Sequence, residues 1–197
     1  MASPEPVKVV LLGEAGVGKT CIISQFISGV FDPDTITTLS SQFISKTIDF
    51  KDINKAIKFD IWDTAGQEKF RALAKIFYKD AKVICLVYDI TSHKTFEALK
   101  EYWNERTKLY VDEDPIFAVV ANKNDLYESQ QVIEEEAKEF AKSINAIYQS
   151  TSAKYNFGIE TLFNNIGHRY FDQIEIKEYQ KKRNEFEKHK FSKYTLY

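Results

Sequence analysis

The stretch "GEAGVGKT", residues 13–20, places three glycines within six positions of a chain that has only 7 glycines in 197 residues. It lies between an apolar run, "VKVVLL", and the amphipathic "CIISQFISGV", an order typical of strand, turn and helix. It fits the pattern G-x-x-x-x-G-K-[ST], in which backbone N–H groups wrap phosphate oxygens and glycine permits close approach. The stretch therefore predicts a phosphate-binding loop, with Lys19 on the phosphates and the Thr20 hydroxyl on Mg²⁺.

Strand-like and helical segments alternate around this loop. The strand-like runs are residues 7–12, 41–50, 55–62, 82–89, 115–121 and 145–150, and helical periodicity follows Lys19, Gln67, Ser92, Ile133 and Phe157. Only "KDIN" separates the second run from the third, which suits an antiparallel hairpin, whereas helices separate the later runs. We predict a three-layer α/β fold of the P-loop NTPase type, with about five helices and a six-stranded, mostly parallel sheet that has one antiparallel edge strand.

Composition sets the outline of the molecule. The chain is 44% hydrophobic, enough for one sizeable core, and its net charge of -2 argues against a nucleic-acid partner recognised by bulk charge. Cys21 and Cys85 lie in apolar surroundings and predict buried thiols in a reducing compartment. We expect a disordered lead over residues 1–6, one domain over 7–171, and a charged tail over 172–197.

Three further stretches narrow the class of nucleotide. In "IWDTAGQE" (61–68), Asp63 is placed to hold Mg²⁺ through water, the Gly66 N–H to meet a γ phosphate, and Gln67 to orient an attacking water. In "NKND" (122–125), Asp125 can accept two hydrogen bonds from guanine, which adenine cannot donate. "TSAK" (151–154) can bring backbone N–H groups to the guanine O6.

These four motifs, in this order, resemble the Ras superfamily of small GTPases, and the sequence looks most like the Rab family from about Val7 to Phe171. The tryptophan of "WDTAGQE" and the "SAK" motif favour the Rab branch. The resemblance implies GTP and GDP as substrate and product, Mg²⁺ as cofactor, and a monomer. The nucleotide-binding residues that it implies are Gly13, Glu14, Ala15, Gly16, Val17, Gly18, Lys19, Thr20, Cys21, Phe31, Thr38, Gly66, Asn122, Lys123, Asp125, Ser152, Ala153 and Lys154.

The resemblance also implies individual roles. Phe31 matches the aromatic that packs edge-on to guanine, and Lys123 the residue whose stem lies over the base. Thr20, Thr38 and Asp63, the last through water, match the metal ligands, and Gln67 with Lys19 the catalytic pair. Without the family resemblance, Phe31 would be interpreted as an ordinary core aromatic.

Partners are implied through the two switch segments: a GTPase-activating protein, an exchange factor and effectors. Phe43, Trp62 and Phe77 have the character of a Rab partner-binding patch, although Trp62 and Phe77 suit a core equally well. Leu39 and Ser40 replace the usual Ile-Gly of Rab switch I, and the Ala15 methyl lies where an incoming arginine must fit, so we expect unusual effector choice and slowed hydrolysis.

Two other classes stay open. A pseudo-GTPase, a binding module that holds nucleotide without turnover, is supported only by Leu39 and Ser40 and opposed by Gln67. A P-loop nucleotide kinase would need an arginine-rich lid, yet only Arg169 and Arg183 follow residue 125. The tail lacks the cysteines that are prenylated in Rab proteins, so we expect a cytoplasmic protein whose peripheral endomembrane association needs a lipidated C-terminus outside this sequence.

Overall fold

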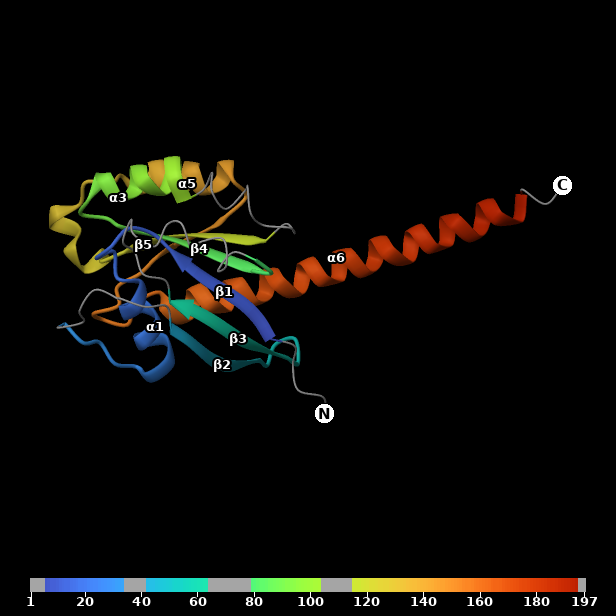
Figure 1. The fold of residues 1–197 in the computed structure, drawn as a ribbon, viewed down its shortest axis with the longest axis horizontal. Coiled ribbons are helices and arrows are strands. Elements are labelled where there is room, and N and C mark those ends of the chain that lie inside the picture. Colours follow the sequence, from blue (N-terminus) through green and yellow to red (C-terminus); the bar gives the residue numbers. More distant parts are fainter. Residues whose placement is uncertain (1–5, 34–41, 64–78, 104–114, 195–197) are drawn as a thin grey trace.

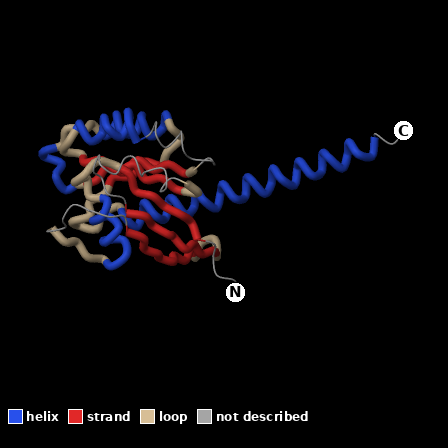
Figure 2. Tube along the Cα trace, viewed as in Figure 1, coloured by secondary structure: helices blue, strands red, loops and turns tan. Residues whose placement is uncertain are grey.

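The computed structural model describes residues 6–33, 42–63, 79–103 and 115–194, which form one six-stranded sheet with helices on both faces (Figures 1 and 2). The strands are β1 (Pro6–Leu12), β2 (Gln42–Phe50), β3 (Lys55–Asp63), β4 (Val83–Asp89), β5 (Ile116–Asn122) and β6 (Ile147–Ser150). Their order across the sheet is β2-β3-β1-β4-β5-β6, and every neighbouring pair is parallel except β2 with β3. The predicted fold class and its antiparallel edge strand are confirmed.

The helices alternate with the strands. They are α1 (Lys19–Ser28), α3 (His93–Ala98), the π-helical turn η2 (Leu99–Trp103), the 3₁₀-helix η3 (Asn124–Ser129), α5 (Glu134–Ser143) and α6 (Ile159–Tyr194). Four predicted helices are thereby confirmed, and the one expected after Gln67 lies outside the described residues.

Two hydrophobic clusters, one on each face of the sheet, make the three layers (Figure 1). On one face α1 packs against α6, where the rings of Phe26 and Phe163 stack with centroids 3.6 Å apart. On the other face α3 and α5 cover the sheet, and Tyr88 of β4 lies with its ring centroid 4.9 Å from that of Phe96. Every residue of β4 is buried, as expected for a central strand covered on both sides.

The two cysteines are free thiols, and they differ in burial. Cys85 is fully buried in β4, as predicted, and desolvation raises the pKa of its thiol to about 12. Cys21 is only partly buried on α1, so the prediction of two buried thiols is wrong for that residue. Its side chain packs against the core cluster but stays partly exposed to solvent.

Helix α6 begins in the core and then leaves the body as a straight rod (Figure 1). Near the point where it leaves the sheet, α6 forms the Lys55–Glu175 ion pair, whose Nζ and Oε1 are 3.0 Å apart. The side chains from there to residue 186 are exposed. The helix continues through Asp172, where the composition changes, so that change marks no break in secondary structure. No described helix combines the length and apolarity that crossing a bilayer requires.

Gly167, on the buried face of α6, generates a prediction about stability. A Cβ at this position would lie 2.0 Å from Cζ of Phe50, whose ring is held edge-on by His168 and Phe171. We expect Gly167→Ala to lower the free energy of unfolding by about 1–3 kcal/mol through overpacking, despite the better helix propensity of alanine. Chemical denaturation at a fixed GDP concentration measures this. Thr161→Ala, on the exposed face of α6, is the control, and equal stability of both variants would contradict the prediction.

Candidate nucleotide site

The loop of residues 13–18 joins the carboxyl end of β1 to the start of α1. Gly18 is the N-cap residue, with φ 95°, and it offers no capping side chain. The first turn of α1 also has no acidic residue. The N–H groups at a helix start carry partial positive charge, and no carboxylate of that turn competes for them. This end of α1 is therefore suited to bind an anion.

Two of the three loop glycines are required by the protein itself. A Cβ on Gly13 would lie 2.1 Å from the Val87 carbonyl oxygen, and one on Gly18 would lie 2.3 Å from Nδ2 of Asn122. Gly16 has φ 79°, and a Cβ there would meet open space. The prediction explained Gly13 and Gly18, at the two ends of the loop, by the backbone angles and close approach that phosphate binding needs. Packing of the loop against β4 and β5 is an additional cause for Gly13 and Gly18 that the sequence does not display.

Lys19 spans the loop with its ammonium group. Its Nζ donates to the carbonyl oxygens of Gly13 and Glu14, both at 2.9 Å, and the residue is only 5% exposed. Desolvation lowers the pKa of Lys19 to about 8, although the carboxylates of Asp63 and Glu14 act in the opposite direction. A buried cation at a helix start gains stability when an anion arrives, which suits the predicted phosphate contact.

Thr20 and Asp63 meet beside the loop. The Thr20 hydroxyl donates to Oδ2 of Asp63 at 2.7 Å, although the two residues are 43 positions apart in sequence. A hydroxyl and a carboxylate are hard oxygen donors, the kind that Mg²⁺ takes together with phosphate oxygens and water. These residues therefore fit the predicted metal site, with Thr20 as a ligand and Asp63 at its side.

Asn122 holds three of the motifs together. Its buried amide donates from Nδ2 to the Val17 carbonyl at 2.8 Å, and its Oδ1 accepts a hydrogen bond from the Thr151 hydroxyl at 3.1 Å. The Asn124 N–H also donates to the Thr151 carbonyl at 3.0 Å. Asn122 thus fastens "NKND" to the phosphate loop and to "TSAK". Thr151 was absent from the predicted site residues although it is the first residue of "TSAK", because its contact with Asn122 depends on loop packing that the motif does not display.

The predicted base-binding residues are also brought together. The Ser152 hydroxyl donates to Oδ1 of Asp125 at 2.6 Å and accepts the Tyr155 N–H at 3.3 Å. Ser152 and Ala153 are buried, whereas Lys154 is exposed. The carboxylate of Asp125 is therefore fixed in direction before a base binds.

Lys123 adopts the left-handed conformation, with φ 66°, and its Nζ lies 2.7 Å from Oδ2 of Asp89. Asp89, the last residue of β4, was not among the predicted site residues. Its neighbour along the sheet is Asn122, a relation that depends on the pairing of β4 with β5 and so is not visible in the sequence alone.

The remaining predicted residues lie in several places. Glu14, Ala15 and Gly16 form the outer part of the loop, with Ala15 and Gly16 exposed. Phe31 is partly buried against the α1–α6 cluster, so its described contacts are those of a core aromatic, and its predicted contact with a base stays a prediction. Thr38, Gly66, Gln67, Leu39, Ser40 and Phe77 lie outside the described residues.

Phe43 and Trp62 lie side by side on the β2–β3 hairpin, with ring centroids 5.3 Å apart. Phe43 is 52% exposed and Trp62 is partly buried. Phe43 is therefore reachable from solvent, whereas Trp62 also packs against a core cluster, and the partner-binding patch stays a prediction.

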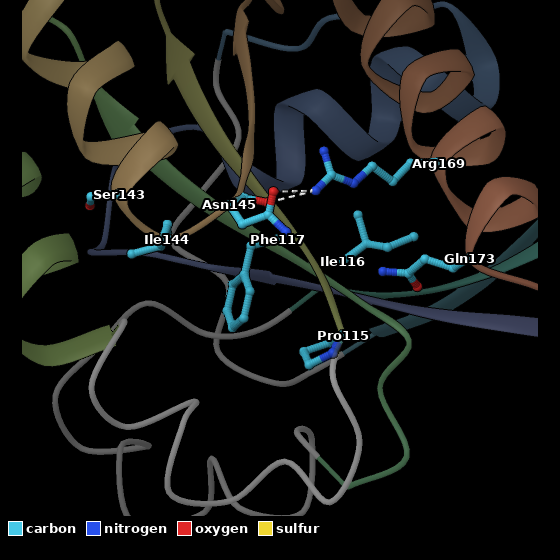
Figure 3. Close-up of a pocket in the computed structure, with 8 residues that line it drawn as sticks. All are labelled: Pro115, Ile116, Phe117, Ser143, Ile144, Asn145, Arg169 and Gln173. Carbon is cyan, nitrogen blue, oxygen red and sulfur yellow. Dashed lines mark hydrogen bonds between the residues drawn. The ribbon is translucent and has the colours of Figure 1, made fainter. Parts of the chain in front are cut away.

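A separate hollow of about 330 Å³ lies at the opposite edge of the sheet, where β5 begins (Figure 3). Arg169 of α6 donates there to the backbone oxygen and Oδ1 of Asn145, at 3.0 and 2.7 Å. The phosphate loop, Asp125 and Ser152 all lie at the carboxyl edge, which is where ligands bind in open α/β sheets. The hollow is therefore distinct from the candidate nucleotide site.

The lowered pKa of Lys19 predicts proton uptake on nucleotide binding. In the free protein this lysine is about half deprotonated at pH 8, and the bound phosphates should keep it charged. We expect GDP binding to take up about half a proton at pH 8 and about a tenth at pH 7. Titration calorimetry in buffers with different heats of ionisation measures the uptake. Equal uptake at the two pH values would contradict the assignment.

The Asp125 carboxylate generates a prediction about base choice. In Asp125→Asn one acceptor oxygen becomes a donor, which mismatches the guanine N1–H and 2-amino groups but suits the 2-oxo group of xanthine. We expect GTP affinity to fall about 5- to 150-fold and the preference to pass to XTP. Competition binding measures both nucleotides. Glu128→Gln, which neutralises an exposed carboxylate on η3, is the control. Continued preference for GTP in Asp125→Asn would refute the guanine assignment.

Comparisons with known proteins agree with this geometry. A profile of the Ras family matches residues 8–172. The Ras-related protein Rab-22A of Homo sapiens is 42% identical over 162 residues, which are 82% of each chain. RabJ of Dictyostelium discoideum is 43% identical over 160 residues, 81% of this chain and 61% of its own. Rab-30 of Homo sapiens is 39% identical over 156 residues, 79% of this chain and 75% of its own. The chain therefore belongs to the Ras family and is a Rab-like small GTPase, an enzyme that hydrolyses GTP.

Proposed function

We propose that the protein is a Mg²⁺-dependent switch that alternates between GTP and GDP, hydrolyses GTP slowly on its own, and regulates vesicle traffic. The observation that carries the proposal is the buried Lys19 ammonium at the start of α1, next to the Thr20–Asp63 pair. A cation, a helix start and two hard oxygen donors meet at one point. The triphosphate end of a nucleotide with its metal has the complementary charges.

Hydrolysis needs an oriented water and compensation of the charge that develops on the γ phosphate. Gln67 would orient the water, and Lys19 would hold the β and γ oxygens. Thr20, Thr38 and Asp63 would hold Mg²⁺, which supplies further positive charge to the phosphates. An arginine from an activating partner would raise the rate by about 10³–10⁵-fold. Ala15 lies exposed at the outer part of the loop, and its methyl group would hinder that arginine.

Partner proteins would detect the bound nucleotide through the ordering of two switch segments, one containing Thr38 and the other Gly66. The γ phosphate would hold Thr38 and Gly66, and its loss would release them. Effectors, an exchange factor and an activating protein would read these segments together with the Phe43–Trp62 surface on the adjoining hairpin. The expected setting is the cytoplasm, with peripheral association to endomembranes.

The proposal is tested by the nucleotide that copurifies with the chain. We expect the purified protein to carry GDP, and reloaded GTP to convert to GDP over minutes to hours in the presence of Mg²⁺. Chromatography of the released nucleotide identifies it. GTP that stays unconverted for many hours would instead indicate a binding module without turnover, and the absence of any guanine nucleotide would reject the proposal.

Gln67→Leu isolates the hydrolytic step. Leucine keeps the volume and removes the amide, so we expect GTP affinity to persist while single-turnover hydrolysis falls by about tenfold or more. The same loss is expected in the presence of an activating protein. Gln173→Leu on α6, far from the loop, is the control. Wild-type turnover in Gln67→Leu would mean that another group positions the water.

A further inference from the structure

We infer that Asp89 is a positioning residue for the nucleotide site: it holds the Lys123 ammonium so that the lysine stem is already in place when a guanine base binds. The inference deepens the proposed function and rests on it. Its central observation is the ion pair between Nζ of Lys123 and Oδ2 of Asp89, at 2.7 Å, which joins the ends of two neighbouring strands.

The Asp89 carboxylate is held from its other side. Oδ1 accepts hydrogen bonds from the N–H and the hydroxyl of Thr91, at 2.9 and 2.7 Å. The backbone N–H of Asp89 donates to the Thr95 hydroxyl at 3.1 Å, and its carbonyl accepts the Ser92 N–H at 3.0 Å. The start of α3 thus fixes both the main chain and the carboxylate of Asp89. Its side chain is 11% exposed, so the whole group is a rigid acceptor.

Lys123 needs such an acceptor. Its side chain is 34% exposed, and its backbone is in the left-handed conformation directly after β5. A lysine side chain has four rotatable bonds, and freezing them on binding costs free energy. A carboxylate that already holds the ammonium removes much of that cost from the binding step. The remainder of the stem lies between this anchor and a backbone that Asn122 and Thr151 hold in place.

The position of Asp89 at the end of β4 ties it to the strand that precedes Lys123. Asp89 and Asn122 are register partners, and the Ile90 N–H donates to the Asn122 carbonyl at 3.1 Å. The anchor and the lysine therefore move together with the sheet. Among the described residues, the base site is held by two strands and one helix start. Because GDP and GTP carry the same guanine base, we expect the effect of Asp89 to be the same for both nucleotides.

Asp89→Asn tests the inference with little change in shape. The amide oxygen can still accept the Thr91 hydrogen bonds, but the amide nitrogen faces the lysine as a donor and no longer anchors it. We expect release of fluorescent GDP to become about 3- to 10-fold faster in Mg²⁺, the range set by freeing one long side chain. GTP release should become faster by the same factor. Asp60→Asn on β3 removes the same charge outside the site and is the control.

A double-mutant cycle separates positioning from a structural effect on the turn before α3. Lys123→Met keeps the stem and removes the ammonium, so Asp89→Asn should add less than a further twofold in that background. Factors that multiply would overturn the inference, because Asp89 would then act without Lys123. Release at the wild-type rate in Asp89→Asn would also overturn it and leave the proposed function intact. A wild-type protein that binds no guanine nucleotide would reject both.

Discussion

The buried amide of Asn122 is the constraint on which the rest of the site depends. It lies at the end of β5 and contacts the phosphate loop through Val17 and the last motif through Thr151. Because its two amide atoms have opposite polarity, one side chain satisfies a carbonyl on one loop and a hydroxyl on the other. The fit is close enough that Gly18 cannot carry a Cβ. Three loops from distant parts of the chain therefore keep one mutual geometry, and the base and phosphate sites stay at a fixed separation.

The sequence was sufficient for the fold and for the residues that define the motifs. The directions of the strands followed from the short "KDIN" connection and from the helices between the other strands, and each motif lies at a carboxyl strand end. It could not show the supporting residues. Asp89 belongs to no motif, and Thr151, although it opens "TSAK", was given no role, since the contacts of both residues arise from sheet register and loop packing. Phe31 shows the opposite case: its spacing from Lys19 suggests a base contact, while its described contacts are with the core.

Burial of the Lys19 ammonium at the start of α1 carries a free-energy cost that a bound anion offsets. The Lys19 ammonium has few water contacts, and the start of α1 has no capping side chain. A nearby anion would stabilise both groups. Such a site binds a polyanion strongly because the positive charge of the site and the negative charge of the ligand compensate one another. Ligand binding also stabilises the folded protein by mass action. Nucleotide binding and folding stability should therefore be linked in this chain, as the position of the lysine already implies.

The rod formed by the outer part of α6 has a consequence for reach. From Glu175 to Tyr194 the helix is about 28 Å long, at 1.5 Å per residue. A flexible segment of that length would let the body rotate freely about its attachment, but a helix acts as a stiff spacer. A molecule that binds the far end of the helix is held at a defined distance and in a defined direction from the nucleotide-binding face. Geometry as well as affinity would then decide which molecules can meet on that face.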